Sequence, residues 1–351
     1  MGEKTSKERV RLGVFGAGSI AEQALNEISV LEGVEVVVLV NRPSPRRDEL
    51  GSRFGVTLVV DSMADVPQHA CDAVYIATPN FLHASLAQAA CRNGWHVLLE
   101  KPFAMNYSEA VAVSRVVRES GREVVLAMNQ RFTPEAFSMR EKIAQGEVGK
   151  VYRLRAWCHR RSGIPTLGSW FGCRRLSGGG VLCDLGVHFL DVALWILNDF
   201  EVKSVAASIS AEYGPRGEGG GSWGASSQSD LPFDVEDFAS LQVRMQSGVV
   251  AQFEFSWAAP PRVEPEAELE VWGQSGVLRW SESGQESRRP SAEKGPVSRF
   301  EEFRNVIRDG ISPSVSLEQA LTVQAFLDAA YLSAAQQREV RIDEVRRDSV
   351  G

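Results

Sequence analysis

The stretch VRLGVFGAGSIAEQALNEI, residues 10–28, joins a short apolar strand to a helix through a glycine-containing turn. The turn follows the pattern G-x-G-x-x-A, with the residues Gly16, Gly18, Ser19, Ile20 and Ala21. Two glycines here permit a tight turn and a close approach of backbone to a pyrophosphate, which binds at the helix N-terminus. A glycine turn without a ligand is the alternative. The motif predicts a dinucleotide-binding βαβ unit.

The next apolar run, VEVVVLV at 34–40, has the character of a buried parallel strand at the distance expected for such a unit. Sites that prefer NAD usually carry an Asp or Glu after this strand, on the ribose 2′-hydroxyl. Here the residues are Asn41 and Arg42, and Arg46 and Arg47 add positive charge or start a solvated helix. A guanidinium can grip a phosphate with two hydrogen bonds, so we predict NADP or NAD as cofactor, with NADP favoured.

Strand-like and helix-like segments continue to alternate, with strands predicted at 72–78, 96–102 and 123–129 and a helix at about 81–93. Strands separated by helices of this length predict a doubly wound parallel sheet. Ligands of such sheets bind at the carboxyl ends of the strands. Those ends carry the short sequences TPN, EKP and NQRF.

The totals restrict the class of protein. A chain of 351 residues exceeds the usual size of one core, so two domains are expected. A net charge of −7 with scattered basic residues argues against nucleic acid as the main partner. With no long uncharged run and no apolar leader at the start, we expect no membrane association and a cytoplasmic location. Five cysteines without a C-x-x-C pair suggest neither a disulfide framework nor a zinc site, and Cys183 is better explained as an apolar packing residue than as a nucleophile.

From about residue 150 the pattern changes to period-2 strands. The sequence VYRLRAWCH at 151–159 alternates, and LQVRMQSGVVAQFEFSW at 241–257 has the pattern of a hairpin with Gly248 in its turn. The segment LEVWGQSGVLRW repeats that design. We therefore predict an α+β C-terminal domain with a large mixed or antiparallel open-faced sheet, against which the helix following residue 180 packs.

That helix begins in GGGVLCDLGVHFLD, residues 178–191, where Asp184, His188 and Asp191 are the polar side chains of an apolar run. At about 100° per residue their spacing puts all three on one helix face. A solvent-facing stripe, a metal site and an acid/base constellation all fit this pattern. The three glycines are expected to let a substrate approach the helix.

Together these motifs resemble the Gfo/Idh/MocA family of oxidoreductases, which use a nicotinamide dinucleotide on sugars, cyclitols and related polyols. The resemblance rests on GAGSIA at 16–21, TPNFLH at 78–83, GWHVLLEKP at 94–102, NQRF at 129–132 and the 178–191 stretch. FDVEDFA near 233–239 and LEQALTVQAFLDAAYLSA near 317–334 extend it. The order and spacing of the five motifs agree with the family.

The resemblance implies catalytic roles for Lys101, Asp184 and His188, and it makes Lys101–Pro102 a candidate cis peptide. Oxidation of an alcohol needs a proton to leave the hydroxyl, and an imidazole titrates near working pH. We expect His188 to exchange that proton, Asp184 to orient the pair and Lys101 to polarise the oxygen, with the first and last roles exchangeable. No metal is expected. Besides the glycine-turn residues and Asn41 and Arg42, the predicted cofactor-binding residues are Thr78, Pro79, Asn80, His83, Glu100, Lys101 and Asn129.

For the substrate, the glycine-rich loop before the helix offers arginine donors and an aromatic ring suited to a polyhydroxylated ring. The predicted substrate residues are Arg131, His159, Arg161, Trp170 and Arg174, each with a solvated structural role as its alternative. The Gly/Ser-rich stretch 213–230 is either a lid or an inert excursion, and 281–296 reads as a further mobile loop.

The predicted organisation is a dinucleotide-binding Rossmann domain over 8–128 and a domain for substrate binding and oligomerisation over 129–345. A helix at about 316–336 is expected to pack back toward the first domain. The predicted function is hydride transfer between NAD(P) and a ring secondary alcohol or ketone of a sugar, glycoside or (amino)cyclitol, in a homodimer or homotetramer. The alternatives are an NAD-dependent enzyme that cleaves glycosides by transient oxidation and elimination, and a non-catalytic cofactor-sensing regulator.

Overall fold

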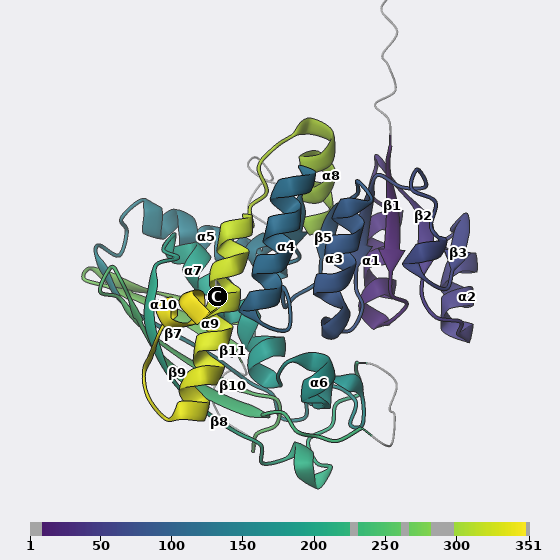
Figure 1. The fold of residues 1–351 in the computed structure, drawn as a ribbon. Coiled ribbons are helices and arrows are strands. Elements are labelled where there is room, and N and C mark those ends of the chain that lie inside the picture. Colours follow the sequence, from purple (N-terminus) through teal and green to yellow (C-terminus); the bar gives the residue numbers. More distant parts are fainter. Residues whose placement is uncertain (1–8, 225–230, 261–266, 282–297, 349–351) are drawn as a thin grey trace, which may run out of the picture. The chain divides into compact units, whose positions relative to one another are not determined.

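The computed structural model describes residues 9–224, 231–260, 267–281 and 298–348. The chain forms two compact units (Figure 1). The first comprises Met1–Glu100, Ala112–Ala127 and Pro296–Leu317, and the second Lys101–Val111, Met128–Gly295 and Glu318–Gly351. The units are therefore interleaved along the sequence, whereas the sequence pattern suggested two contiguous ranges. Most of the expected mobile loop at 281–296, and the end of the 213–230 stretch, lie outside the described residues.

The first unit contains a parallel sheet of six strands in the order β3-β2-β1-β4-β5-β6. Its strands are β1 (Val10–Phe15), β2 (Val34–Val40), β3 (Leu58–Val60), β4 (Ala73–Ile76), β5 (His96–Leu99) and β6 (Val124–Leu126). The strand order reverses between β1 and β4, which is the point where ligands bind in such sheets. The predicted doubly wound Rossmann sheet is confirmed.

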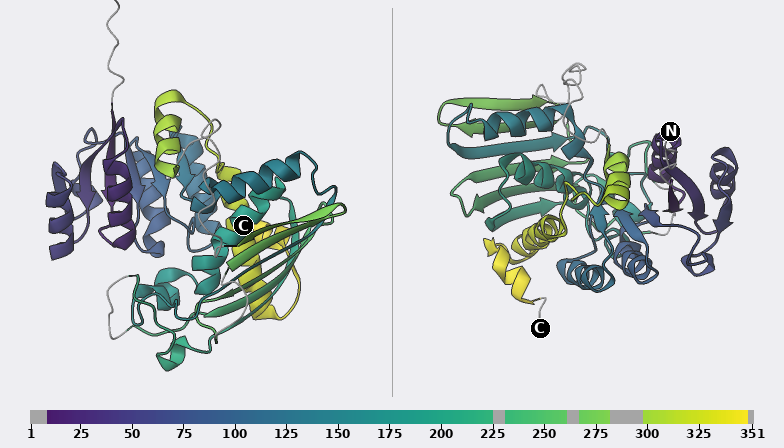
Figure 2. Two further views of the ribbon diagram at one scale, coloured as in Figure 1. Left: turned by 180° about the vertical axis from the view of Figure 1, so that it is seen from behind. Right: turned by 90° about the horizontal axis from the view of Figure 1, so that it is seen from above.

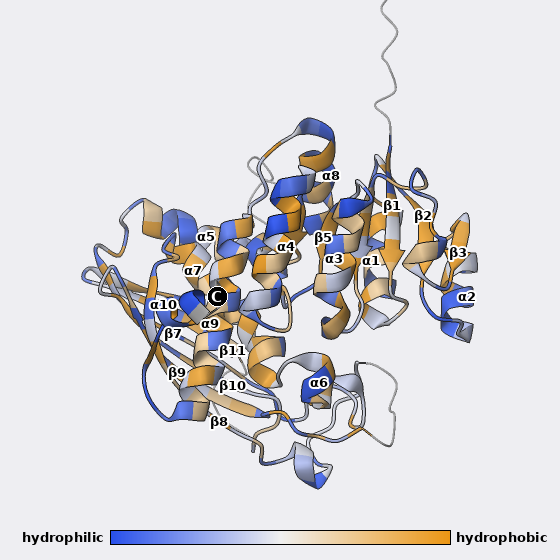
Figure 3. Ribbon diagram, in the orientation of Figure 1, coloured by the Kyte–Doolittle hydropathy of each residue, from blue (hydrophilic) through white to orange (hydrophobic). Residues whose placement is uncertain are grey.

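Helices cover this sheet because their apolar residues recur on one side. They are α1 (Ser19–Ser29), α2 (Pro45–Arg53), α3 (His83–Arg92), α4 (Tyr107–Ser120) and α8 (Arg299–Asp309). In α1 the buried residues are Ala21, Ala24, Leu25 and Ile28, at helical spacing. Figure 3 shows the same division, with β3 hydrophobic and α2 largely hydrophilic. From far along the chain, α8 adds Phe300 and Phe303 to this core.

The second unit contains a mixed sheet of seven strands in the order β12-β11-β7-β10-β9-β8-β13. The strands are β7 (Val151–His159), β8 (Val202–Ser210), β9 (Phe238–Met245), β10 (Val250–Ser256), β11 (Ala267–Gly273), β12 (Gly276–Ser281) and β13 (Val340–Arg341). Seen from above in Figure 2, they lie side by side in one curved layer. Only β7 and β10 pair in parallel among the described strands of this sheet. The predicted sheet and its two hairpins are confirmed.

One face of this sheet is covered by helices. The ring of Phe189 lies 5.6 Å from that of Phe255, and Phe326 packs edge-on against Phe253 at 6.2 Å. The helices of the unit are α5 (Pro134–Ala144), α6 (Arg174–Ser177), α7 (Val187–Leu197), α9 (Leu317–Gln336) and α10 (Ile342–Asp348). A short π-helix, η5 (Leu182–Gly186), leads into α7. In β7, Arg153 and Arg155 alternate with the buried Leu154 and Ala156. The two arginines therefore project from the opposite face of the sheet.

Among the described residues, one segment, Arg174–Leu197, is long and apolar enough to pass for a membrane span. Within its apolar window, 89% is buried inside the structure. This is the behaviour of a core helix, since every residue from Gly179 to Ile196 except His188 is buried.

Candidate active site

The glycine turn after β1 has the geometry of a dinucleotide cradle. Gly16 has a φ of +111°, and a Cβ there would lie 2.5 Å from the carbonyl oxygen of Ala77. Gly18 is the N-cap of α1 without a side-chain cap, and a Cβ on it would meet nothing within 4 Å. Ser19 and the 39% exposed Ile20 follow in the first turn. The turn therefore leaves open space beside Gly18 at the N-terminus of α1, as a pyrophosphate site requires.

The segment after β4 adds a polar group that needs a partner. The hydroxyl Oγ1 of Thr78 is buried and has no hydrogen-bond partner among the described residues. His83 holds this segment in place, since its Nε2 lies 3.0 Å from the carbonyl oxygen of Thr78. Pro79 and the buried Asn80 lie between them, and the ring of Phe81 is 41% exposed. An orphaned hydroxyl beside an open cradle fits a bound dinucleotide.

After β2, the three arginines have different surroundings. Arg46 pairs with Glu22 at 2.6 Å, and Arg47 pairs with Asp61 at 2.5 Å and donates to the carbonyl oxygen of Asn41. The Arg42 guanidinium is exposed and bonds to no residue that the structure describes. Arg42 is thus the arginine at this strand end that can reach a ligand.

After β5, the chain passes from one unit to the other. Glu100 belongs to the first unit, where it accepts a hydrogen bond from the hydroxyl of Tyr75 at 2.5 Å. Lys101 belongs to the second unit, and the Lys101–Pro102 peptide bond is cis, as the sequence suggested. One peptide bond therefore links a residue of the Rossmann strand to the ammonium-bearing residue.

In the second unit, Lys101 is bound to Asp184. Its Nζ donates to Asp184 Oδ1 at 2.7 Å and to the Asp184 carbonyl oxygen at 2.9 Å. The other carboxylate oxygen, Oδ2, accepts from the indole Nε1 of the fully buried Trp257 at 2.9 Å. Burial alone would raise the pKa of Asp184, but the Lys101 charge and the hydrogen bonds from Lys101 and Trp257 outweigh it and lower this pKa. Asp184 therefore stays ionised and holds the ammonium in one position.

The predicted polar stripe divides between two environments. His188 is the partly exposed residue of an otherwise buried segment, four residues beyond Asp184. Asp191 instead binds the fully buried Arg131, with Oδ2 accepting from Nε at 2.7 Å and Oδ1 from Nη2 at 2.6 Å. Asp191 therefore supports the helix through a buried ion pair. Asp184 lies in the π-helix, whose wider turn departs from the 100° per residue on which the predicted stripe was based.

The three glycines before the π-helix make room for the chain itself. A Cβ on Gly179 would lie 1.9 Å from the Tyr331 hydroxyl, and one on Gly180 would lie 1.9 Å from the carbonyl oxygen of Glu236. The Oε1 of Glu236 accepts from the amides of Gly180 and Leu182, at 2.9 and 3.1 Å, and from Tyr331 at 2.8 Å. Gly179 and Gly180 are therefore required by the packing of the chain itself, and the approach of substrate past this segment stays a prediction.

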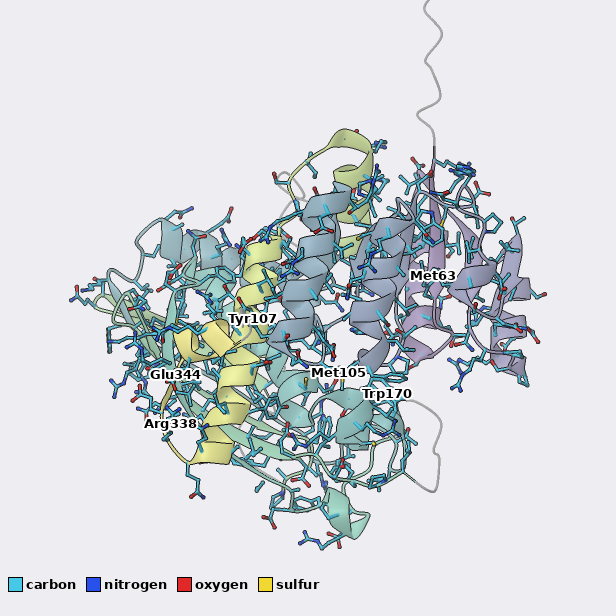
Figure 4. All side chains as sticks on the ribbon, in the orientation of Figure 1. Met63, Met105, Tyr107, Trp170, Arg338 and Glu344 are labelled. Atoms are coloured by element: carbon cyan, nitrogen blue, oxygen red, sulfur yellow. The ribbon has the colours of Figure 1, made fainter. Side chains whose placement is uncertain are left out.

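The residues predicted to contact substrate differ in their burial and in their protein partners. Arg131 binds Asp191 and the side chain of Gln319, so its guanidinium is turned inward. His159 is buried and lies 2.8 Å from Glu254. Arg174 donates from its backbone to Asp234. Arg161 is exposed, Trp170 is half-buried in the segment beside α6 (Figure 4), and Asn129 begins the turn after β6. Contacts thus join Lys101 to Asp184 and leave Arg131 and His159 with protein partners.

The reactivity of Cys183 and the possibility of a metal site also bear on the chemistry. Burial raises the pKa of the Cys183 thiol to about 12, as expected for a packing residue. In the ranges that the structure describes, no group of three or more His, Cys, Asp or Glu side chains is arranged to hold a metal ion.

Comparison with known proteins places this geometry in a family. Residues 10–128 match the model of an oxidoreductase family with an NAD-binding Rossmann fold, and residues 138–279 match the GFO/IDH/MocA C-terminal domain. The chain is 34% identical to 1,5-anhydro-D-fructose reductase of Ensifer adhaerens over 76% of its own length and 74% of that relative. The chain belongs to the Gfo/Idh/MocA family of oxidoreductases.

A second relative and a solved structure are also similar to this chain. D-glucoside 3-dehydrogenase of Escherichia coli (strain K12) is 28% identical over 71% of this chain and 70% of that relative. The solved structure of levoglucosan dehydrogenase with NADH superposes with a TM-score of 0.78, at 22% identity, covering 95% of this chain and 99% of that one. At that identity the superposition establishes the shared fold. This family member is thus an oxidoreductase with an NAD-binding Rossmann domain.

The sequence patterns missed Trp257 and Glu236, which hold the segment that carries Asp184. Trp257 ends an apolar alternation and reads as a core residue. Glu236 carries a signal, since an acid in the run FDVEDFA next to buried strand residues needs a partner. Pairing either with residues 180–184 requires the fold.

Proposed function

We propose that this protein transfers hydride between NAD(P) and a ring secondary alcohol or ketone of a sugar, glycoside or (amino)cyclitol. The main support is the ion pair between Lys101 and Asp184. Asp184 lies four residues before the partly exposed His188. A non-catalytic sensor needs none of these three groups. Relatives named as a sugar reductase and a glucoside dehydrogenase support the same reaction class.

The residues that would hold the cofactor are the glycine turn, the first turn of α1, and Thr78 at the end of β4. The exposed Phe81 ring and the Arg42 guanidinium extend this surface. A nicotinamide bound there supplies or accepts the hydride.

The chain's own residues manage the proton. His188 removes the proton from the substrate hydroxyl during oxidation and returns it during reduction, since imidazole titrates near neutral pH. Lys101 donates a hydrogen bond to the reacting oxygen and stabilises the negative charge that develops on it. Asp184 fixes the ammonium by two contacts and is itself fixed by Trp257. The roles of His188 and Lys101 are exchangeable in this scheme.

The cofactor preference proposed here is NADP over NAD. Arg42 supports it, because a guanidinium without a protein partner among the described residues replaces the usual carboxylate. Calorimetric titration with each cofactor tests the preference, and tighter binding of NAD than of NADP would contradict it.

The proposed assembly is a homodimer or homotetramer formed by the face of the seven-stranded sheet that projects Arg153 and Arg155. Strand alternation places polar side chains on that face, and the described helices α7 and α9 pack on the other. Sedimentation measures the state, and a monomer at micromolar concentration would rule the assembly out.

The proposed reaction is tested by incubating the protein with sugars, inositols and glycosides and either cofactor, while absorbance is followed at the nicotinamide band. A substrate-dependent change with a ring polyol is expected. Release of free sugar from a glycoside without net absorbance change would indicate the glycoside-cleaving alternative, and cofactor binding without any turnover would indicate a sensor.

A further inference from the structure

Three aromatic rings gather in the second unit, two from the loop before the catalytic segment and one from the loop after β8. Trp170 stacks on Phe171 with ring centres 3.8 Å apart, and Phe171 meets Trp223 edge-on at 5.8 Å. All three side chains are half-buried, so each ring keeps accessible surface. Half-exposed rings in one cluster are unusual for a loop, because apolar surface of this kind is stabilised by burial.

Hydrogen bonds of the loop after β7 hold Trp223 of this cluster in place. Thr166 donates from both its amide and its hydroxyl to the carbonyl oxygen of Trp223, each at 2.8 Å. Ile164 donates to Gly219 at 3.0 Å and accepts from Gly221 at 2.8 Å. The glycine-rich excursion is thus tied to the loop after β7 by backbone hydrogen bonds, and Trp223 has a fixed place.

Arg160 connects the cluster with Asp184. Its guanidinium carbon lies 5.4 Å from the centre of the Trp223 ring. Its positive charge is also one of the influences that lower the pKa of Asp184, after the effects of burial, Lys101 and Trp257. In addition, the amide of Gly163 donates to the carbonyl oxygen of Trp257, the residue that binds Asp184, at 2.7 Å. The cluster is therefore linked through Arg160, and through the loop at Gly163 and Trp257, to the catalytic carboxylate within the second unit.

We propose that Trp170, Phe171, Trp223 and Arg160 form a second subsite that binds the sugar ring attached to the one being oxidised. The proposal rests on the proposed function and narrows its substrate to a glycoside with two rings. Aromatic faces pack against the apolar C–H face of a pyranose, and the Arg160 guanidinium, stacked over Trp223, can direct N–H donors to hydroxyl groups. A purely apolar aglycone would leave those donors without acceptors.

The test compares kcat/KM for methyl glucoside, phenyl glucoside and a glucosyl disaccharide in wild type and in Trp223→Leu. Wild type is expected to favour the disaccharide over methyl glucoside, and Trp223→Leu to reduce that ratio about tenfold, as the loss of one aromatic contact would. Phe171→Leu provides a second variant with the same expectation. Trp272→Leu is the matched control, since Trp272 also lies under an arginine, Arg153 at 5.0 Å, in β11.

The outcomes separate the two proposals. If wild type turns over no sugar, inositol or glycoside with either cofactor, the proposed function fails. If it turns over other ring polyols but none of these glucosides, only the second subsite is wrong. If wild type is active but the disaccharide ratio is the same in Trp223→Leu, Phe171→Leu and the control, the second subsite is wrong. If wild-type kcat/KM for phenyl glucoside exceeds that for methyl glucoside as much as the value for the disaccharide does, the site binds an apolar aglycone, and the proposal is overturned. Circular dichroism of each variant verifies that the ratio is measured on folded protein.

Discussion

At Asp184, both carboxylate oxygens and the backbone carbonyl oxygen accept hydrogen bonds from the protein before any substrate binds. This arrangement leaves the carboxylate little freedom and limits the Lys101 ammonium to one direction. Preorganised charge of this kind stabilises a developing oxyanion without the reorganisation that water would need. The side chain that remains accessible for proton exchange is His188.

Replacing Lys101 or His188 by Ala should lower kcat by about 10²- to 10⁴-fold, the usual contribution of a positioned acid or base. The cofactor should still bind to both variants, because the glycine turn and Thr78 are unchanged. Steady-state kinetics and cofactor titration measure the two effects. Lys203→Ala, at an exposed position in β8, is the control. Near-normal turnover in both variants would contradict the assignment.

Trp257→Phe should affect chemistry through Asp184. Its indole hydrogen bond is one of the contacts that lower the pKa of Asp184, so removing it raises that pKa. Asp184 would then become protonated at a higher pH, and the loss of kcat on acidification should begin at a higher pH than in wild type. A pH profile of kcat detects the shift. A uniform loss of activity at all pH values would mean that Trp257 has only a packing role.

Sequence reasoning identified the chemical residues because they lie in compact motifs. Lys101 follows a strand of obvious pattern, and Asp184 and His188 are the polar residues of an apolar run. The partner Trp257 lies more than seventy residues further on, as the separation of 73 residues in this hydrogen bond shows. Such a contact depends on how the π-helix packs against the sheet, which no local pattern encodes.

At the scale of elements, the π-helix η5 depends on one buried acid. Glu236 binds two amides at its beginning and the Tyr331 hydroxyl through a single oxygen. Burial raises the pKa of Glu236 above its ordinary value, although these hydrogen bonds act in the opposite direction. The segment that carries Asp184 is therefore anchored by a group whose charge is costly in the folded state.

A carboxyl with a raised folded pKa stabilises the folded state below its unfolded pKa and loses that contribution as pH rises through the folded pKa. Glu236→Gln, which stays neutral, should therefore gain in unfolding free energy relative to wild type as pH rises. Urea denaturation at several pH values measures the difference. Glu344→Gln is the control of opposite sign, because Arg338 holds the pKa of Glu344 at about 2. Parallel curves for Glu236→Gln and wild type would refute the prediction.

The buried pair of Arg131 and Asp191 anchors α7 to the turn after β6. Asp191→Ala leaves a buried guanidinium without its carboxylate, so we expect a loss of about 3–5 kcal/mol in unfolding free energy. The exposed pair Arg216–Glu218 is the comparison, and Glu218→Ala should cost less than about 1 kcal/mol. Chemical denaturation of both variants decides. A small effect at Asp191 would instead favour the predicted contact of Arg131 with substrate.

At the scale of the whole molecule, α8 completes the Rossmann core from the other end of the chain. Phe303 is 2% exposed within that core, and Phe300 packs edge-on against Tyr75 at 5.2 Å. Phe303→Ala should cost about 3–5 kcal/mol in unfolding free energy, as for other buried Phe residues. The exposed Ile311 provides the control variant Ile311→Ala. Denaturation midpoints compare them, and equal midpoints would show that α8 is dispensable for the core.

The sequence allowed both sheets and many element bounds to be predicted, since their patterns are local. The strand at Val10–Phe15 lies where its apolar run predicted it, and the helix at Leu317–Gln336 matches the helix expected at about 316–336. The assignment of α8 to the first unit was missed. An amphipathic pattern indicates that one face of a helix is buried, but it does not indicate which element covers that face. The short strand β3 was missed as well, since three residues carry little periodicity.

The interleaving of the two units has a consequence for biosynthesis. When the ribosome has delivered residues 1–127, the six-stranded sheet is complete, yet the side of the core that α8 covers is still bare. That side stays open until α8 (Arg299–Asp309) emerges, so the nascent sheet exposes apolar surface while strands β7 to β12 are being synthesised. For the same reason, neither unit can be exchanged between genes as a single uninterrupted cassette.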